Sequence, residues 1–156
     1  MAEQSKKPDA IKVLIRNRKA RHDYTIDEDF EAGMVLMGSE VKSLRAAKAT
    51  VVDAYGVIKN GELWLENAQI EPYPQANNFN HEPFRTRKLL MNKLEIRRIK
   101  GKVEEKGYTL IPLEIYVKRG RIKIQLGLAR GKKHWDKRES KRERDVARDL
   151  ERERAD

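Results

Sequence analysis

The clearest alternation of apolar and polar residues lies in the segments 108–117 and 121–128. In the first segment, Leu113, Ile115 and Val117 occupy every second position, with Glu114, Tyr116 and Lys118 between them. Arg119 and Gly120 separate the two segments and supply a turn. A period of two predicts an antiparallel pair of strands, each with one buried face and one partly basic face toward solvent.

A second hairpin is predicted between Val51 and Ile70. Asn60 and Gly61 at its centre adopt the positive φ angles of a type I′ turn more readily than other residue pairs, and apolar residues flank them on both sides. Apolar residues also predict a short strand at 11–15 and further strands within 24–36, where acidic residues and Gly33 are expected to interrupt them.

Two helices are predicted. The first begins near Ser39, a favourable N-cap, and continues to about Lys48. The second begins after Asn92, with Glu95 completing a capping box, and ends at Gly107. Its apolar face follows a spacing of three and four residues: Ile96, Ile99 and Val103. The asparagine-rich stretch 75–83 is expected to be a loop.

These elements predict a mainly β fold with flanking helices. About six strands joined by hairpins favour a small antiparallel β-barrel, with a sandwich as the alternative. The expected organisation is a disordered N-terminal arm at 1–10, a barrel domain at 11–130 and a charged tail at 131–156. After Lys137 the only large apolar residues are Val146 and Leu150, so the tail is expected to be disordered alone and to become helical on a partner.

The charge of the chain indicates which class of partner it binds. Charged residues make up 38% of the sequence, and the formal net charge is +10. Such a basic protein favours polyanions, either nucleic acid or an anionic membrane surface. No apolar stretch has the roughly 20 residues of a membrane span, and the absence of cysteine is compatible with a reducing, cytoplasmic compartment.

Candidate catalytic groups are sparse. No nucleophile elbow, phosphate-binding loop, zinc-ligand spacing or dinucleotide fingerprint occurs. His22 and Asp23 are expected to lie on a strand, where they would point to opposite faces and could not act on one proton. We therefore expect no enzymatic activity, no metal and no cofactor. We also expect a monomeric protein.

Several motifs, taken in order along the chain, resemble the SsrA-binding protein (small protein B) family, the bacterial partners of transfer-messenger RNA (tmRNA). The motifs are Asn17 to Tyr24, Phe30 to Gly33, Gly38 to Arg45, Arg85 to Leu90, Gly131 to Lys133 and Asp136 to Arg138. This resemblance implies an oligonucleotide-binding (OB) type of barrel. It also implies binding to the tRNA-like domain of tmRNA and delivery of that RNA to stalled ribosomes for trans-translation.

The resemblance and the basic clusters together give a set of candidate RNA-binding residues. Family positions important for RNA binding fall on Glu31, Leu90 and Asn92. Cations near aromatic residues, the combination that suits RNA, add Arg18, Lys19, Arg21, Tyr24, Arg85, Arg87 and Lys88. The motif Asn17 to Tyr24, through the resemblance, adds Asn17 and His22.

The resemblance also assigns residues of the tail to the ribosome. There the tail is expected to enter the decoding region and the messenger channel and to become helical. The residues concerned are Gly131, Lys132, Lys133, Trp135, Asp136, Lys137 and Arg138. Trp135 stands where family members often carry His or Tyr, and its flat ring keeps stacking on a ribosomal base available.

Two other functions remain open from the sequence. A general ribosome-associated or ribosomal protein would carry similar basic clusters and a similar tail. An RNA-processing enzyme is motivated only by His22, Asp23 and Glu31 near a basic surface.

Overall fold

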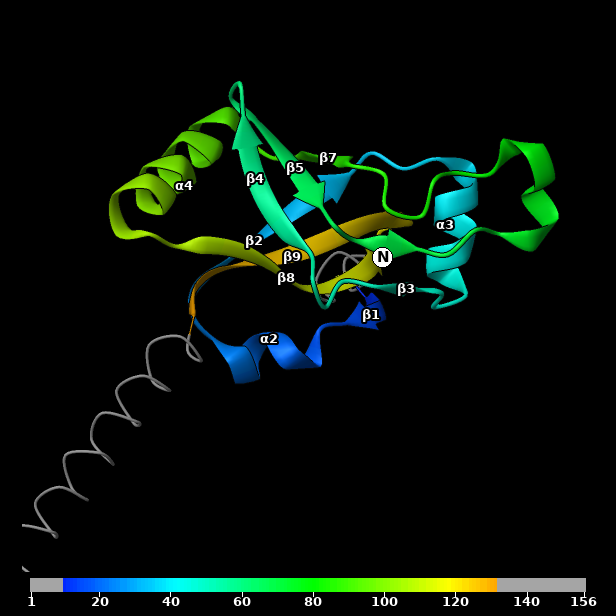
Figure 1. Ribbon diagram of the computed structural model, residues 1–156, viewed down its shortest axis with the longest axis horizontal. Helices are drawn as coiled ribbons and strands as arrows, with labels where there is room; N and C mark the ends of the chain where they lie inside the picture. Colours follow the sequence, from blue (N-terminus) through cyan, green and yellow to red (C-terminus); the bar gives the residue numbers. More distant parts are fainter. Residues whose placement is uncertain (1–9, 132–156) are drawn as a thin grey trace, which may run out of the picture.

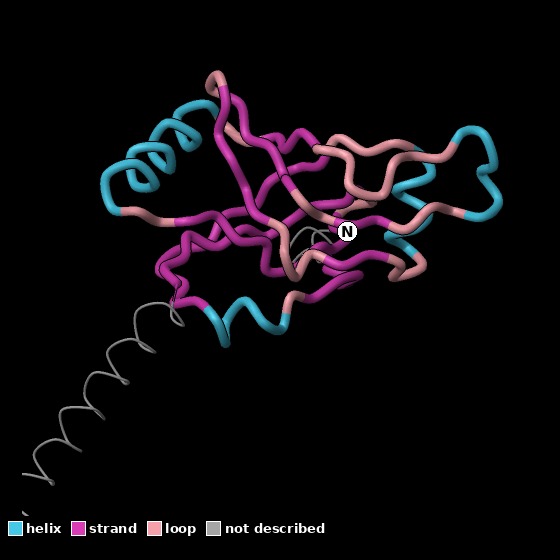
Figure 2. The backbone as a smooth tube through the Cα atoms, viewed as in Figure 1, coloured by secondary structure: helices cyan, strands magenta, loops and turns pink. Residues whose placement is uncertain are grey.

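The computed structural model describes residues 10–131 (Figures 1 and 2). The elements in chain order are β1 (Ile11–Arg16), α2 (Arg18–Asp23), β2 (Tyr24–Met34), α3 (Gly38–Arg45), β3 (Ala49–Thr50), β4 (Tyr55–Lys59), β5 (Glu62–Glu66), β6 (Gln69–Ile70), the 3-10 helix η1 (Pro74–Phe79), β7 (Arg87–Leu90), α4 (Lys93–Lys106), β8 (Thr109–Lys118) and β9 (Arg121–Gly131).

Seven strands form one antiparallel sheet in the order β1-β8-β4-β5-β7-β2-β9, and a further pairing of β8 with β9 closes it into a ring. Strand β8 is long enough to pair with two strands along one edge. It contacts β4 at Leu110 and β1 from Glu114 to Lys118. Strands β3 and β6 form a separate two-stranded sheet. The predicted small antiparallel barrel is therefore confirmed.

The barrel interior is filled by aliphatic side chains that are wholly buried, among them Leu65, Ile115, Ile124 and Leu126. Helix α4 and helix α3 lie at opposite ends of the molecule (Figure 1) and complete this core with Ile99 and Leu44. Helix α2 builds a second, smaller core on the outside of the barrel. Its Ala20 packs against Ile111, Leu113 and Ala129 of β8 and β9.

Both predicted hairpin turns are confirmed. Asn60 and Gly61 have φ angles of 53° and 74°, and Arg119 and Gly120 have 53° and 72°. Two successive positive φ angles give a turn whose twist matches that of the flanking strands. The predicted end of the second helix is also confirmed, since Gly107 has a φ angle of 68° and caps α4 through its backbone N–H.

Four local predictions are wrong. His22 and Asp23 lie in the helix of residues 18–23 rather than on a strand, and η1 lies within the stretch expected to be a loop. The acidic residues of 24–36 do not interrupt the chain, because β2 runs through them with one bulge between Ile26 and Glu28. Helix α3 is capped at Met37, and Ser39 instead bonds to the buried His81 ring over 2.8 Å.

The predicted caps of α4 are confirmed in part. The Asn92 side chain accepts a hydrogen bond from the Leu94 N–H over 2.9 Å, as an N-cap should. Glu95 has no reciprocal bond to the Asn92 backbone in the described contacts and lies 4.0 Å from Arg98 instead. Among the helices of residues 10–131, none is long and apolar enough to cross a membrane.

Candidate nucleic-acid interface

The outer surface of strands β1, β8, β9 and β2 carries a row of polar side chains, which we call the outer face. The strand register places Arg16 opposite Glu114, Glu114 opposite Gln125, and Gln125 opposite Glu31. Directly paired residues of neighbouring antiparallel strands have their side chains on the same side of the sheet. The row therefore crosses four strands from the end of β1 to the middle of β2.

Glu31 is held firmly on this face. The Tyr116 hydroxyl donates a short hydrogen bond to its carboxylate, and the Lys118 ammonium lies 3.2 Å away. The hydrogen bond from Tyr116, aided by Lys118, keeps the pKa of Glu31 below its usual range. Burial and the bond to Glu31 raise the pKa of Tyr116. Glu31 is thus a fixed, ionised hydrogen-bond acceptor, and the surface around it is basic.

Cations surround this carboxylate. Glu31 lines a recess of about 540 Å³ with Lys118, Arg119, Arg121 and Lys123. An adjoining recess of about 270 Å³ shares Arg121 and Lys123 and is lined by Leu90, which is 53% exposed. Strands β2 and β7 approach closely here, and a Cβ added to Gly33 would lie 3.3 Å from the Leu90 Cβ. Two predicted positions far apart in the chain, Glu31 and Leu90, therefore line adjoining recesses that share Arg121 and Lys123.

Asn92 follows Leu90 by two residues and is exposed at the start of α4. Its side-chain oxygen is engaged with the Leu94 N–H, while Leu94 itself is 72% exposed. The unpaired N–H groups of a helix N-terminus favour anions. Asn92 thus serves the structure as a cap and at the same time fixes a helix end next to Leu90.

The cluster on α2 lies at the other end of the outer face. Arg18, Lys19, Arg21 and His22 are exposed, as predicted for residues that contact a polyanion. Asn17 is different, because it is 5% exposed and its amide donates to the Pro112 carbonyl over 2.8 Å. Tyr24 is half-buried and packs against the small core under α2. Asn17 and Tyr24 thus fasten the cluster to the barrel.

The second predicted basic cluster is largely used inside the protein. Arg87 is wholly buried, with its Nε 2.5 Å from Glu40 and further hydrogen bonds to the carbonyls of Ala68 and Pro83. Its prediction as an RNA contact is therefore wrong. Arg85 lies 2.6 Å from the same Glu40 carboxylate, and Lys88 lies 3.2 Å from Glu62.

Glu40 is the buried anion of this group. Burial raises the pKa of its carboxyl, but hydrogen bonds from Arg85, the Met37 N–H and Arg87 outweigh that effect and hold the pKa below its usual value. The same contacts join α3, β7 and the loop before β7. Arg85 and Arg87 therefore stabilise the fold by connecting these elements through Glu40.

The His22 and Asp23 side chains are closer than predicted. Because they lie on α2 rather than on a strand, the His22 Nδ1 is 3.0 Å from the Asp23 carboxylate. The argument that they point to opposite faces is therefore wrong. In residues 10–131, no three His, Cys, Asp or Glu side chains gather as metal ligands would.

Sequence reasoning missed several residues of the outer face. Lys118, Arg119, Arg121 and Lys123 are four cations within six residues around the predicted turn, and Tyr116 and Gln125 flank them. The signal that could have found them is the predicted hairpin itself, since pairing its two strands aligns Tyr116 with Lys123 and Lys118 with Arg121. Tyr116 was predicted to face solvent, but it is only 2% exposed because its hydroxyl lies beneath Glu31.

The tail begins where the barrel ends. Gly131 is the last residue of β9 and pairs with Tyr24 at the start of β2. The other predicted tail residues lie outside the described residues: Lys132, Lys133, Trp135, Asp136, Lys137 and Arg138.

Comparisons with known proteins agree along most of the chain. The family described as "SmpB protein" matches residues 14–156. The SsrA-binding protein of Desulforudis audaxviator is 57% identical over 141 residues, covering 90% of this chain and 92% of its own. That of Pelotomaculum thermopropionicum is 56% identical over 143 residues, covering 92% and 94%.

A solved structure described as "tmRNA-SmpB: a journey to the center of the bacterial ribosome" is also similar. It aligns with a TM-score of 0.64 at 54% identity, covering 76% of this chain and 83% of that one. A matching family profile, several relatives above 50% identity and a shared barrel agree. The chain belongs to the SmpB family of SsrA-binding proteins.

Proposed function

We propose that this chain binds tmRNA and delivers it to stalled ribosomes in trans-translation. The observation that carries the proposal is the match to the SmpB family over residues 14–156, which includes every residue of the outer face. The family consists of RNA-binding proteins, so the chain is not an enzyme. Its place of action is the bacterial ribosome, and therefore the cytoplasm.

The outer face is the part of the barrel that docks the tRNA-like domain of tmRNA. Its lysines and arginines suit phosphates, which dominate affinity for a folded RNA. Glu31 has a different task, because an ionised carboxylate accepts hydrogen bonds from a 2′-hydroxyl or a base amino group. Leu90 adds an apolar contact beside it, and Asn92 fixes the adjacent end of α4.

The tail acts on the other partner. Residues 131–156 reach the decoding region and the messenger channel, where Trp135 stacks on a base and the charged segment becomes helical. Such a segment orders only when a partner supplies the missing contacts. The barrel thus provides RNA affinity and the tail provides recognition of an empty channel.

Sequencing the RNA that co-purifies with the chain from its own cells tests the proposal. One dominant small RNA, tmRNA, is expected. Bulk ribosomal RNA without enrichment of tmRNA would instead support a general ribosome-associated protein.

A matched pair of variants locates the docking surface in the same experiment. Neutralising three cations of the outer face should abolish the tmRNA enrichment: Lys118→Gln, Arg121→Gln and Lys123→Gln. The control removes the same charge at exposed positions away from the outer face and should keep the enrichment: Lys48→Gln, Lys59→Gln and Lys100→Gln. Equal losses in both triple variants would mean that overall charge, rather than the outer face, holds the RNA.

A further inference from the structure

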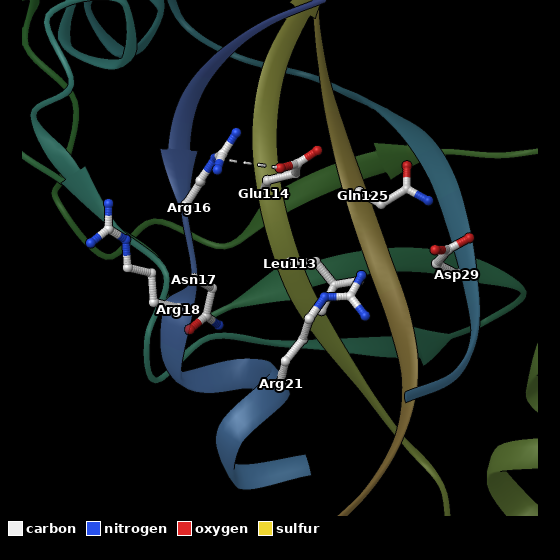
Figure 3. Close-up of a pocket in the computed structure, with 8 residues that line it drawn as sticks. All are labelled: Arg16, Asn17, Arg18, Arg21, Asp29, Leu113, Glu114 and Gln125. Atoms are coloured by element: carbon white, nitrogen blue, oxygen red, sulfur yellow. Dashed lines mark ion pairs between the residues drawn. The ribbon is translucent and has the colours of Figure 1, made fainter. Parts of the chain in front are cut away.

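A third recess lies on the outer face beside helix α2 (Figure 3). Its volume is about 350 Å³, within the range of roughly 300–1,000 Å³ typical of pockets for small molecules. Eight residues from β1, α2, β2, β8 and β9 line it: Arg16, Asn17, Arg18, Arg21, Asp29, Leu113, Glu114 and Gln125. None of the roles described above uses this recess as a binding site.

Hydrogen-bond donors gather on the α2 side. Arg18 and Arg21 are exposed, and neither forms an ion pair within residues 10–131. Arg16 is only loosely engaged, since its Nε lies 4.0 Å from the Glu114 carboxylate. Arginine presents a planar fork of donors that binds phosphate and also stacks on flat rings. These side chains are therefore available to a ligand.

Hydrogen-bond acceptors gather on the sheet side. Figure 3 shows Glu114, Gln125 and Asp29 on three neighbouring strands, with Leu113 between them and Arg21. Asp29 is exposed and has no ion pair in the described part of the chain. An apolar residue next to a ring of acceptors and guanidinium groups suits a flat molecule with polar edges.

Simpler ligands would use only part of this recess. A phosphate alone would be attracted by the three arginines but repelled by the two carboxylates, and a cation would meet the opposite balance. A nucleotide fits both sets, because its phosphate is an anion and its base carries donors. Guanine has two adjacent donors, N1–H and the N2 amino group, which match the two oxygens of one carboxylate, and its flat ring can stack on a guanidinium group.

We propose that this recess holds an unpaired guanine nucleotide of the RNA partner. Asp29 binds the Watson–Crick edge of the base, Arg21 stacks on its face, and Arg18 with Arg16 contacts the phosphate. The inference rests on the proposed function and deepens it. It adds a base-reading pocket to a face whose other contacts depend on shape and charge.

Titration of the full-length chain with mononucleotides tests the pocket. Nuclear magnetic resonance shifts of the arginine Nε–H and Gln125 amide signals report binding by GMP, AMP, CMP, UMP and inorganic phosphate. GMP is expected to bind roughly fivefold or more tighter than the other nucleotides, the lower range of discrimination by one bidentate base contact. Equal affinity for all four nucleotides, or binding of phosphate alone, would overturn the proposal.

A matched substitution separates the pocket from the rest of the fold. Asp29→Asn replaces one acceptor oxygen by a donor and should abolish the preference for GMP while leaving weak phosphate binding. Asp53→Asn changes an exposed aspartate outside the recess and should leave the preference intact. Retention of the GMP preference in Asp29→Asn would contradict the assignment.

Affinity for the tRNA-like domain of tmRNA, measured on the same samples, distinguishes the two proposals. Wild-type protein that binds this RNA but shows no GMP preference would overturn the pocket and leave the function standing. Failure to bind the RNA at all would overturn the proposed function itself.

Discussion

Glu31 and Tyr116 illustrate how one residue fixes another for recognition. A surface glutamate normally samples several rotamers, and ordering it on binding costs free energy. Here the buried Tyr116 hydroxyl and the Lys118 ammonium hold the Glu31 carboxylate before any RNA arrives. The protein therefore presents a preorganised acceptor rather than a mobile one.

Tyr116→Phe should weaken RNA binding without unfolding the barrel. The ring stays in place, but Glu31 loses the hydrogen bond that contributes most to its lowered pKa. The pKa of Glu31 is therefore expected to rise toward its usual value, which a titration of the carboxyl carbon by nuclear magnetic resonance would detect. Affinity for the tRNA-like domain should fall at the same time. An unchanged pKa of Glu31 would show that Tyr116 does not hold it.

Arg85 and Arg87 are close in the sequence but differ in burial, and this difference predicts different effects on stability. Arg87→Ala would leave the Glu40 carboxylate buried with one partner fewer, at a cost of about 3–5 kcal/mol in the free energy of unfolding. Arg85→Ala also removes a partner of Glu40, but that side chain is partly exposed and water can replace part of its contact, so a smaller loss of about 1.5–3 kcal/mol is expected. Urea denaturation measures both, and equal losses would contradict the distinction between a buried and an exposed partner.

The lowered pKa of Glu40 makes part of the stability depend on pH. A carboxyl whose pKa is lower in the folded state stabilises the fold fully above its unfolded-state pKa, near 4.5. That contribution is lost as the pH falls through the lower, folded-state pKa. The drop in unfolding free energy between about pH 6 and pH 3 should therefore be smaller in Glu40→Gln than in the wild type. An equal drop would mean that other carboxyl groups account for the acid sensitivity.

At the scale of elements, helix α4 has one glycine in its interior and one at its C-cap, with opposite roles. Gly101 lies in the helix interior with no atom within 4 Å of an added Cβ, so Gly101→Ala should stabilise the protein by about 0.5–1 kcal/mol. Gly107 has a φ angle of 68°, which strains other residues, so Gly107→Ala should destabilise it by about 1 kcal/mol. Thermal unfolding compares the two, and a shift of the same sign in both would contradict this account of α4.

Elements with strong local signals could be predicted from the sequence. The turn at Asn60–Gly61, the alternation of β8 and β9, and the cap of α4 at Asn92 each depend on neighbouring residues, and the structure contains all three. Helix α2 could not be predicted in this way. Six residues rich in arginine gain helical stability by packing Ala20 on the barrel, and that contact is long-range.

The candidate site was predictable only in part, for a related reason. The sequence does not predict strand β7, so it does not indicate which of the side chains in 87–90 are buried. Leu89 points into the barrel, and Arg87, two residues earlier, points the same way. Lys123 and Gln125 join Glu31 only when β9 pairs with β2. Such positions depend on the register between strands, which a basic cluster in the sequence does not indicate.

At the scale of the whole molecule, the closed barrel and the segment after it have separate tasks. The ring of strands is complete at Gly131, and the outer face lies entirely within residues 16–125. RNA affinity should therefore need nothing beyond β9. Activity on the ribosome should need the residues that follow.

A chain that stops after Gly131 tests this division most directly. Its affinity for the isolated tRNA-like domain of tmRNA and the peptide tagging that it supports on stalled ribosomes are measured beside those of the full chain. We expect nearly unchanged affinity and no tagging from the shortened chain. Loss of the RNA affinity in the shortened chain, or tagging at the level of the full chain, would contradict this division.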